Sequence, residues 1–226
     1  MALGIVAVVE STLVRHLVYP ALSWNRDEAA YLWQAGVLRS GHLVASTGGV
    51  PAFFQPWLTG IRGDHFFSQY TLGWPGLMAL SQWIYGSPAL AIPIGVALAV
   101  VGTYAFVRVL TEDRTLALVT SVLVLLSPIV ILQSGVYLSY MFGLGLGTSF
   151  GASLLAGVKQ RSRGLIVAAG ALLGLTFIAR PLDAVLWAVA VGGYVVFTTW
   201  RSWSRQLRIL GQLLVGLAPF VVLTLL

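Results

Sequence analysis

Seven long apolar runs occupy most of this chain, and they limit what it can fold into. Only 9% of its 226 residues are charged and 58% are hydrophobic, whereas a soluble domain carries about 25% charged residues. About 20 apolar residues cross a bilayer as one helix. We therefore expect a single membrane domain over residues 1–226, an all-α polytopic transmembrane bundle of about seven spans. The expected spans are Ala2–Pro20, Ala89–Val107, Thr115–Leu132, Val136–Gly157, Gly164–Ala179, Leu182–Trp200 and Ile209–Leu226.

The first run is the least apolar, because it contains Glu10, Arg15 and His16. It has no basic segment before it and no clear cleavage site, so we interpret it as a first helix and not as a signal peptide. The absence of cysteine excludes disulfides and thiolate metal sites. The net charge of +6 comes from short loops between apolar runs, a pattern that indicates membrane topology and argues against nucleic-acid binding.

Basic residues alternate between the two sides of the expected bundle. The positive-inside rule predicts that the loops richer in arginine and lysine face the cytoplasm. The long polar-edged loop over residues 23–88 then lies outside, which predicts a multi-pass protein of the plasma or inner membrane. The residues of the cytoplasmic loops are Arg108, Arg114, Lys159, Arg161, Arg163, Arg201, Arg205 and Arg208.

This orientation requires that the apolar segment Gly73–Tyr85 does not cross the bilayer. The segment has too few residues to span, it is rich in tryptophan and tyrosine, and Pro75 suits the first turn of a helix. We therefore expect an interfacial helix here.

Asp27 and Glu28 lie just past the first apolar run, at the start of the outer loop. Ser23 or Asn25 can cap a helix that we expect from Asp27 to Ser40, and Gly41 is a natural stop. The two acids fit the first turn because the helix dipole favours negative charge there. They either stabilise the helix start only, or they provide a carboxylate at the membrane surface for catalysis.

Two further groups of residues each allow a structural and a functional interpretation. Asp64 and His65 either form a capped turn with a surface histidine or bind a divalent metal. The metal has weak support because a third ligand is missing, and we assign no other cofactor. Arg180 and Asp183 flank a tight turn between two spans. They form either an ion pair or, through Arg180, a clamp for phosphate. The small residues of Gly143–Gly157 predict close helix packing.

Four segments carry a resemblance to a known family. They are RDEAAYLWQAGVLRSG, QYTLGWPGLMALSQWIYGSPALA, RVLTEDRTLALVTSVLVLLSPI and GLTFIARPLDAV. In order and spacing, across nearly the whole chain, they resemble the N-terminal membrane module of the GT-C glycosyltransferases. That family includes aminoarabinose lipid A transferases and protein O-mannosyltransferases, which use polyprenyl-phosphate sugars.

The resemblance implies roles for six residues. Asp27 matches the catalytic aspartate and Glu28 its neighbouring acid, while Arg180 matches a basic position that faces the lipid phosphate. The implied substrate-binding residues also include Gln69, Tyr70 and Tyr140. The chain departs from the family where Thr71 and Leu72 replace a Pro-Pro pair, and where Ser139 and Tyr140 stand at a position that is often acidic or histidine. The second departure weakens a metal role.

The resemblance therefore predicts an inverting glycosyltransferase that acts outside the cytoplasm. It would transfer a sugar from a polyprenyl-phosphate donor to a hydroxyl of an envelope glycan, lipid or protein. Family members are much longer, so the resemblance implies either a transferase or its N-terminal module. Three alternatives stay open for such a module: a fragment, a truncated gene product, or half of a split enzyme that works with a C-terminal half or partner subunit. The alternatives are an inactive membrane scaffold and, less favoured because the later spans lack central ionisable groups, a transporter.

Overall fold

The computed structural model describes residues 2–49 and 55–224. Helices make up 74% of the chain, so the fold is nearly all-α, as expected. The helices of the first part are α1 (Ala2–Leu17), α2 (Asp27–Arg39), α4 (Gly73–Tyr85), the short η1 (Pro88–Leu90), α5 (Ala91–Thr111), α6 (Arg114–Leu125) and α7 (Pro128–Gln133). Those of the second part are α8 (Tyr140–Gln160), α9 (Arg163–Ala179), α10 (Pro181–Trp187), η2 (Ala188–Gly192), α11 (Gly193–Thr198) and α12 (Trp203–Leu223).

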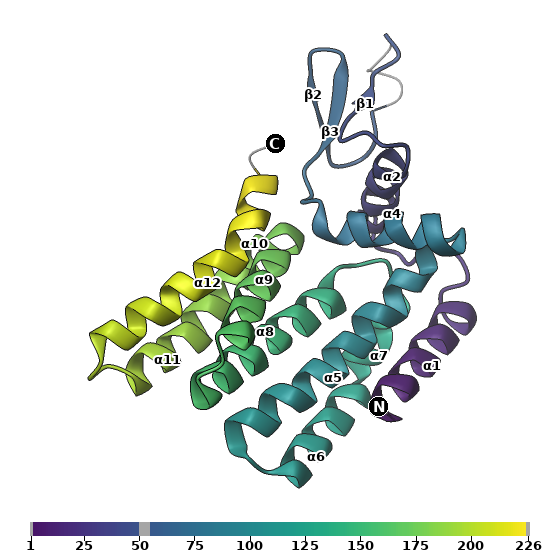
Figure 1. Cartoon of the computed structure of the whole chain (residues 1–226). Coiled ribbons are helices and arrows are strands. Elements are labelled where there is room, and N and C mark those ends of the chain that lie inside the picture. Colours follow the sequence, from purple (N-terminus) through teal and green to yellow (C-terminus); the bar gives the residue numbers. More distant parts are fainter. Residues whose placement is uncertain (1, 50–54, 225–226) are drawn as a thin grey trace.

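The long helices pack side by side into a bundle (Figure 1). Glycine allows the close approach of α5 and α8, since a Cβ on Gly145 would lie 2.7 Å from the backbone nitrogen of Ala99. The prediction that the small residues of Gly143–Gly157 serve helix packing is thereby confirmed. Among the described residues, four helices are long and apolar enough to cross a membrane: Pro88–Thr111, Tyr140–Gln160, Pro181–Thr198 and Trp203–Leu223. The remaining three expected spans correspond to shorter helices, so the structure supports a membrane protein without deciding the number of spans.

Several expected spans begin or end elsewhere in the structure. The span Thr115–Leu132 is broken into α6 and α7, because Ser127 precedes Pro128 and adopts an extended conformation (ψ 126°) that a helix cannot continue. The span Val136–Gly157 begins only at Tyr140. Its first residues form a buried irregular segment instead, anchored where the Ser11 hydroxyl donates to the Ser134 carbonyl at 2.7 Å.

The last two spans also differ from the prediction. Residues 181–198 form one helix whose middle turn, η2, is a π-helix. Helix α12 starts at Trp203, well before the expected Ile209, so Arg205 and Arg208 lie on a helix and not in a loop. Long arginine side chains tolerate this position because their charged ends can reach the aqueous side. Residues 225 and 226, where the last expected span ends, lie outside the described residues.

The outer loop contains a small sheet that the sequence did not predict. Strands β1 (Ala45–Ser46), β2 (Thr59–Arg62) and β3 (His65–Ser68) are antiparallel in the order β1-β3-β2. A two-residue turn at Gly63 and Asp64 joins β2 to β3, and Gly63 has the positive φ of 58° that such a turn requires. The all-α prediction was therefore wrong for this loop. Residues 50–54 of the loop lie outside the described residues.

Helix α4 lies across the ends of the long helices and not alongside them (Figure 1). Its 13 residues span about 20 Å at 1.5 Å per residue, which is less than the ~30 Å hydrocarbon thickness of a bilayer. Buried side chains from α2, α4, α5 and α8 form one core beneath it. Trp74 anchors α4 there, because it is 1% exposed and its indole nitrogen donates to the Tyr137 carbonyl at 2.7 Å.

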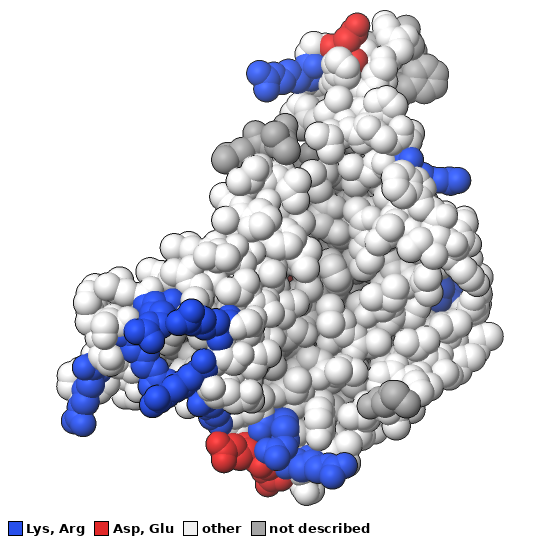
Figure 2. Space-filling model, in the orientation of Figure 1, with Lys and Arg blue, Asp and Glu red and all other residues white. Residues whose placement is uncertain are grey.

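The charged side chains are concentrated at the opposite end of the bundle. Figure 2 shows the largest group of Lys and Arg side chains around the ends of α8, α9, α11 and α12, and a smaller group beside acidic side chains near the connection of α5 to α6. The expected cytoplasmic loops contain eight of the 13 basic residues but only two acidic ones, Glu112 and Asp113. The other five basic and five acidic residues cancel, so this end carries the whole net charge of +6.

Candidate functional site

The candidate site lies where the outer loop meets the end of the bundle. Helix α2 begins at Asp27 as predicted, and the Asn25 side-chain oxygen accepts from the Asp27 backbone nitrogen at 2.9 Å. The helix ends at Arg39, one residue before the predicted Ser40, and Gly41 follows with a left-handed φ of 84°. These local contacts hold the Asp27 carboxylate, which is half-buried, at the beginning of the helix.

Glu28 has a different environment from Asp27. It is fully buried, and its carboxylate accepts hydrogen bonds from the Ser23 hydroxyl and, at 3.2 Å, from the Ser23 backbone nitrogen. Ser23 therefore does not cap the helix through its own side chain; Glu28 ties the preceding segment to α2 instead. Because the Glu28 carboxylate is buried and bonded to Ser23, its role is to hold the start of α2, and with it Asp27, in position.

Arg180 lies at the turn between α9 and α10 and has three partners. Its Nε donates to the Asp183 carboxylate, so the predicted ion pair is confirmed. One terminal nitrogen donates to the Ser139 hydroxyl at 3.0 Å. The guanidinium carbon also lies 4.5 Å from the centre of the Tyr140 ring, a cation–π geometry. Side-chain exposures of 25% for Arg180 and 27% for Asp183 leave both groups partly accessible at the surface of the protein.

Two tyrosines connect Arg180 with the outer loop. The Tyr31 hydroxyl lies 3.2 Å from the Ser139 hydroxyl, which also accepts from Arg180. The rings of Tyr31 and Tyr70 stack with their centres 4.2 Å apart. Gln34, one turn further along α2, donates to the Tyr70 carbonyl at 3.1 Å. Helix α2, the segment before α4 and the bundle end are thus joined through a continuous set of contacts.

Burial and the nearby Asp27 carboxylate both raise the pKa values of the two tyrosines, with opposing contributions from some of their other neighbours. Burial raises the pKa of Tyr70, and the adjacent Asp27 carboxylate raises it further, while the Gln69 side chain opposes the change. Burial also raises the pKa of Tyr31, with Ser139 and Arg180 lowering it and Asp27 raising it. Asp27 and Arg180 are therefore both close enough to Tyr31 to affect its ionisation. The two stacked rings therefore lie near both a candidate base and a candidate anion-binding group.

Two glycines make room for this arrangement. A Cβ on Gly143 would lie 2.5 Å from Arg180 Cδ, so the guanidinium rests directly on the α8 backbone. A Cβ on Gly73 would lie 2.7 Å from the Ala179 backbone nitrogen, which brings the start of α4 against the end of α9. The Thr71 hydroxyl donates to the Ala179 carbonyl at 3.0 Å at the same junction.

The structure brings most of the predicted site residues together. Asp27, Gln69, Tyr70, Tyr140 and Arg180 all contribute to one cluster, whereas Glu28 faces the buried side of α2.

Sequence reasoning missed the residues that connect the cluster, Tyr31 and Ser139. Both are uncharged and nearly buried, and Tyr31 fits an apolar helix position. Ser139 gave a weak signal, since it stands where the family often has an acidic residue or a histidine.

The described residues contain no group of three or more His, Asp or Glu side chains that could hold a metal ion. Asp64 belongs to the β2–β3 turn, where its carboxylate accepts from the Thr47 hydroxyl at 3.2 Å. This agrees with the interpretation of Asp64 as a turn residue.

No family model, curated protein or solved structure matches this chain. The similarity to the GT-C glycosyltransferases therefore remains a prediction, and the function has to be argued from the cluster itself.

Proposed function

We propose that this chain is a membrane glycosyltransferase, or the N-terminal module of one, of the GT-C type. It transfers a sugar from a polyprenyl-phosphate donor to an acceptor hydroxyl on the extracytoplasmic side of the plasma membrane. The observation that carries the proposal is that one set of contacts links both residues: Arg180 binds Ser139, Ser139 contacts Tyr31, and Tyr31 stacks on Tyr70, which lies beside Asp27. A transferase needs a base for the acceptor and a cation for the leaving phosphate, and these two residues supply both.

The proposed topology has seven spans: α1, α5, α6 with α7, α8, α9, the helix of residues 181–198, and α12. Four of these meet the length and composition of a spanning helix, and the three shorter ones lie beside them in the bundle. The basic end faces the cytoplasm. The Asp27–Arg180 cluster lies at the other end, beside the start of α4, where a lipid-linked donor and a polar acceptor can meet.

The proposed reaction is a single displacement at the anomeric carbon. Asp27 takes the proton of the acceptor hydroxyl while its oxygen attacks the anomeric carbon. The bond between that carbon and the phosphate oxygen breaks, and its electron pair leaves with the lipid phosphate. Attack from the side opposite the phosphate inverts the configuration. General-base catalysis of this kind accelerates a reaction by roughly 10²–10⁴-fold.

Arg180 is the proposed partner of the departing phosphate. The Asp183 and Ser139 contacts use Nε and one terminal nitrogen, and a guanidinium has five N–H donors. The remaining donors can bind a phosphate oxygen without breaking either contact. Tyr140 beneath the guanidinium keeps its plane fixed. Gln69 and Tyr70, next to Asp27, are placed to contact the sugar or the acceptor.

The decisive experiment uses membranes that contain this chain and a radiolabelled polyprenyl-phosphate sugar. We expect label to move to an acceptor with the wild-type chain and not with Asp27→Asn, whose amide has nearly the same size but cannot accept the proton. The proposal fails if donor binds to neither chain, or if Asp27→Asn transfers label as fast as wild type.

A second candidate function is a non-catalytic membrane scaffold or partner related to these transferases. The ion pair between Arg180 and Asp183 favours it, because a paired arginine has a structural role even when no phosphate binds. A scaffold predicts that Asp183→Asn and Arg180→Ala destabilise the protein equally and that neither changes donor affinity.

A further inference from the structure

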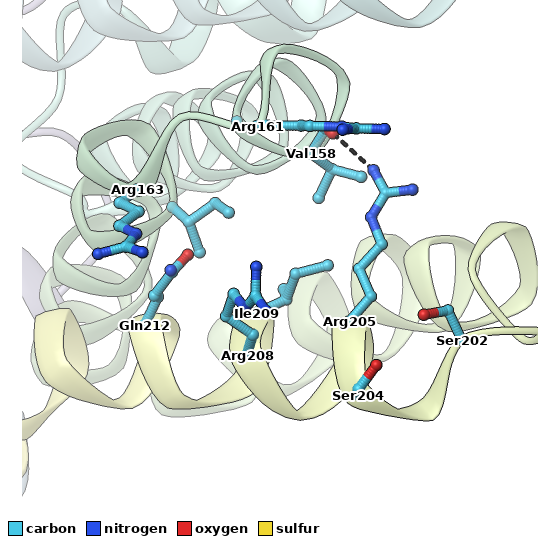
Figure 3. Close-up of a pocket in the computed structure, with 11 residues that line it drawn as sticks. Val158, Arg161, Arg163, Ser202, Ser204, Arg205, Arg208, Ile209 and Gln212 are labelled. Carbon is cyan, nitrogen blue, oxygen red and sulfur yellow. Dashed lines mark hydrogen bonds between the residues drawn. The ribbon is translucent and has the colours of Figure 1, made fainter.

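A cavity of about 300 Å³ opens at the basic end of the bundle, far from the Asp27–Arg180 cluster. It lies between the loop that joins α8 to α9 and the first turns of α12. Figure 3 shows four arginines around it: Arg161 and Arg163 from the loop side, and Arg205 and Arg208 from α12. Ser202, Ser204 and Gln212 add uncharged polar groups to the lining.

The positive charge of this cavity is not neutralised within the described part of the chain. The lining residues include no aspartate or glutamate. None of the four arginines forms an ion pair with a residue in the ranges 2–49 and 55–224. The ion pair found at this end of the bundle joins Lys159 to Glu112 at 2.8 Å. Arginines that repel one another gain from an anion placed between them.

Backbone geometry places charged side chains at the cavity. Helix α9 begins beside it at Arg163, while α12 lies along it and contributes Arg205, Arg208 and Gln212 to the lining (Figure 3). Arg161 occupies the left-handed position after α8, with a φ of 54°, where glycine is the usual residue. The chain has an arginine at this strained position, and its side chain borders the cavity.

One arginine is already oriented by the protein. An Arg205 terminal nitrogen donates to the Val158 carbonyl at 2.9 Å, which fixes the guanidinium at the cavity wall and leaves its other donors available (Figure 3). A planar guanidinium held in this way matches two oxygens of a phosphate.

We propose that this cavity binds the phosphate group of an anionic phospholipid from the cytoplasmic leaflet. A second cavity of about 330 Å³ favours a lipid over a free phosphate ion. It shares Ile209 with the basic cavity and is otherwise lined almost entirely by apolar residues of α8, α9, α11 and α12, including Leu210 and Leu213. A phospholipid can place its headgroup among the arginines and an acyl chain along the apolar wall.

The cytoplasmic assignment rests on the orientation in the proposed function, but the binding itself does not. The competing explanation is that the arginines only enforce topology, which any basic residue at this end would do equally well. The two explanations differ in whether position within the cavity matters.

The test measures phospholipid binding to the purified chain in a neutral detergent, by native mass spectrometry. The probes are dioleoyl phosphatidylglycerol and, as the neutral control, dioleoyl phosphatidylcholine. We expect Arg205→Gln with Arg208→Gln to weaken phosphatidylglycerol binding about 10-fold or more, since each basic residue at a lipid surface contributes severalfold. The matched control is Arg108→Gln with Arg201→Gln, which removes the same charge from the same end outside the cavity lining; we expect it to bind like wild type.

Three results would overturn the proposal. The two double variants could weaken binding equally, which would mean that only total charge matters. The wild type could bind both lipids alike. Inorganic phosphate at millimolar concentration could displace phosphatidylglycerol completely, which would indicate a site for the free ion. Because the assay needs neither a membrane orientation nor a sugar donor, its failure and the failure of transferase activity can be told apart.

A second variant covers the case in which the arginine substitutions prevent folding. Ser204→Asp with Gln212→Glu adds negative charge to the lining while keeping Arg205 and its bond to Val158. We expect the same loss of phosphatidylglycerol binding, with helicity and elution volume unchanged. Normal binding by this folded variant would contradict the proposal.

Discussion

Tyr31 and Tyr70, separated by 39 positions in the sequence, stack with ring centres 4.2 Å apart and an interplanar angle of 28°. The contact joins α2 to the segment that leads into α4. It also lies near Asp27, which raises the pKa of both tyrosines, and near Arg180, which lowers that of Tyr31. The geometry of the candidate site therefore depends on this pair, and several predictions concern residues around it.

Tyr70 should make the protein sensitive to alkali. Burial and the neighbouring Asp27 carboxylate raise its pKa in the folded state above the value of about 10 found in unfolded chains. A raised pKa gives stability that is fully present below pH ~10 and is lost as the pH rises towards the folded-state pKa. Thermal unfolding in detergent should therefore show wild type losing stability relative to Tyr70→Phe between about pH 10 and 11.5. Parallel curves for the two proteins would exclude this linkage.

The two acids at the start of α2 should respond differently to loss of charge. Asp27→Asn should remove transfer while expression, folding and donor binding stay near wild type, because its carboxylate is half-buried and accessible. Glu28→Gln should lower the free energy of unfolding by about 1–3 kcal/mol, the cost of weakening a buried hydrogen-bonded group, since Glu28 binds Ser23. Unfolding and transfer assays on both variants would separate these effects. Equal small losses in rate would argue against Asp27 as the base.

Arg180 should act through both its charge and its planar fork. Arg180→Lys keeps the charge but cannot reproduce the contacts to Asp183 and Ser139 together, so it should retain partial donor binding. Arg180→Ala should lose donor binding. The measurement is binding of a polyprenyl-phosphate sugar to purified protein, with Asp183→Asn as the comparison. Intact affinity in both Arg180→Ala and Asp183→Asn, with equal loss of stability, would favour the scaffold.

A substitution at Gly143 should change the position of the Arg180 side chain without a direct contact to the substrate. A methyl group in Gly143→Ala would lie 2.5 Å from Arg180 Cδ and would displace the guanidinium from the α8 backbone. We expect a loss of donor affinity similar to that of Arg180→Lys, with little change in expression. The control is Gly76→Ala on α4, where an added Cβ has no neighbour within 4 Å. If the two variants bind donor equally well, the position of Arg180 is not important for binding.

The orientation can be tested with single cysteines, because the chain has none of its own. Ser46, which is exposed on β1, should react as cysteine with an impermeant thiol reagent in intact cells. Gly164 at the start of α9, exposed and with open space around it, should not react until the cells are lysed. Gly164 is preferable to Ser162, which accepts a capping bond from Leu165. The reverse pattern would contradict both the topology and the location of the site.

Cysteines at Gly76 and Ser87 test whether α4 crosses the membrane. Both should react from outside if α4 lies at the interface, as its 13 residues and its position across the bundle end suggest. Protection of Ser87→Cys alone would mean that α4 spans the bilayer, and every later loop would then face the other way.

The amino-acid sequence by itself determined the class of protein, the expected topology and the local elements. The helix from Asp27 was predicted to within one residue, and Gly73–Tyr85 with the same bounds, because capping residues, glycine stops and apolar periodicity act over a few neighbouring positions. The helix break at Ser127 and the π-helical turn within residues 181–198 could not be predicted in the same way. A long apolar run satisfies the requirement for a span whether or not its backbone is continuous.

Only the tertiary structure decided which side chains meet. Tyr31 and Ser139 contain no charge that would distinguish them in the sequence, yet their contacts link helix α2 with Arg180 across 108 and 41 positions. The same holds for Arg161, Arg163, Arg205 and Arg208, which the sequence shows as loop charges and the fold gathers around one cavity. Such contacts depend on how the helices pack. Packing depends on the close approach of residues far apart in the sequence, such as Gly145 and Ala99, and a local sequence pattern does not predict which residues approach each other.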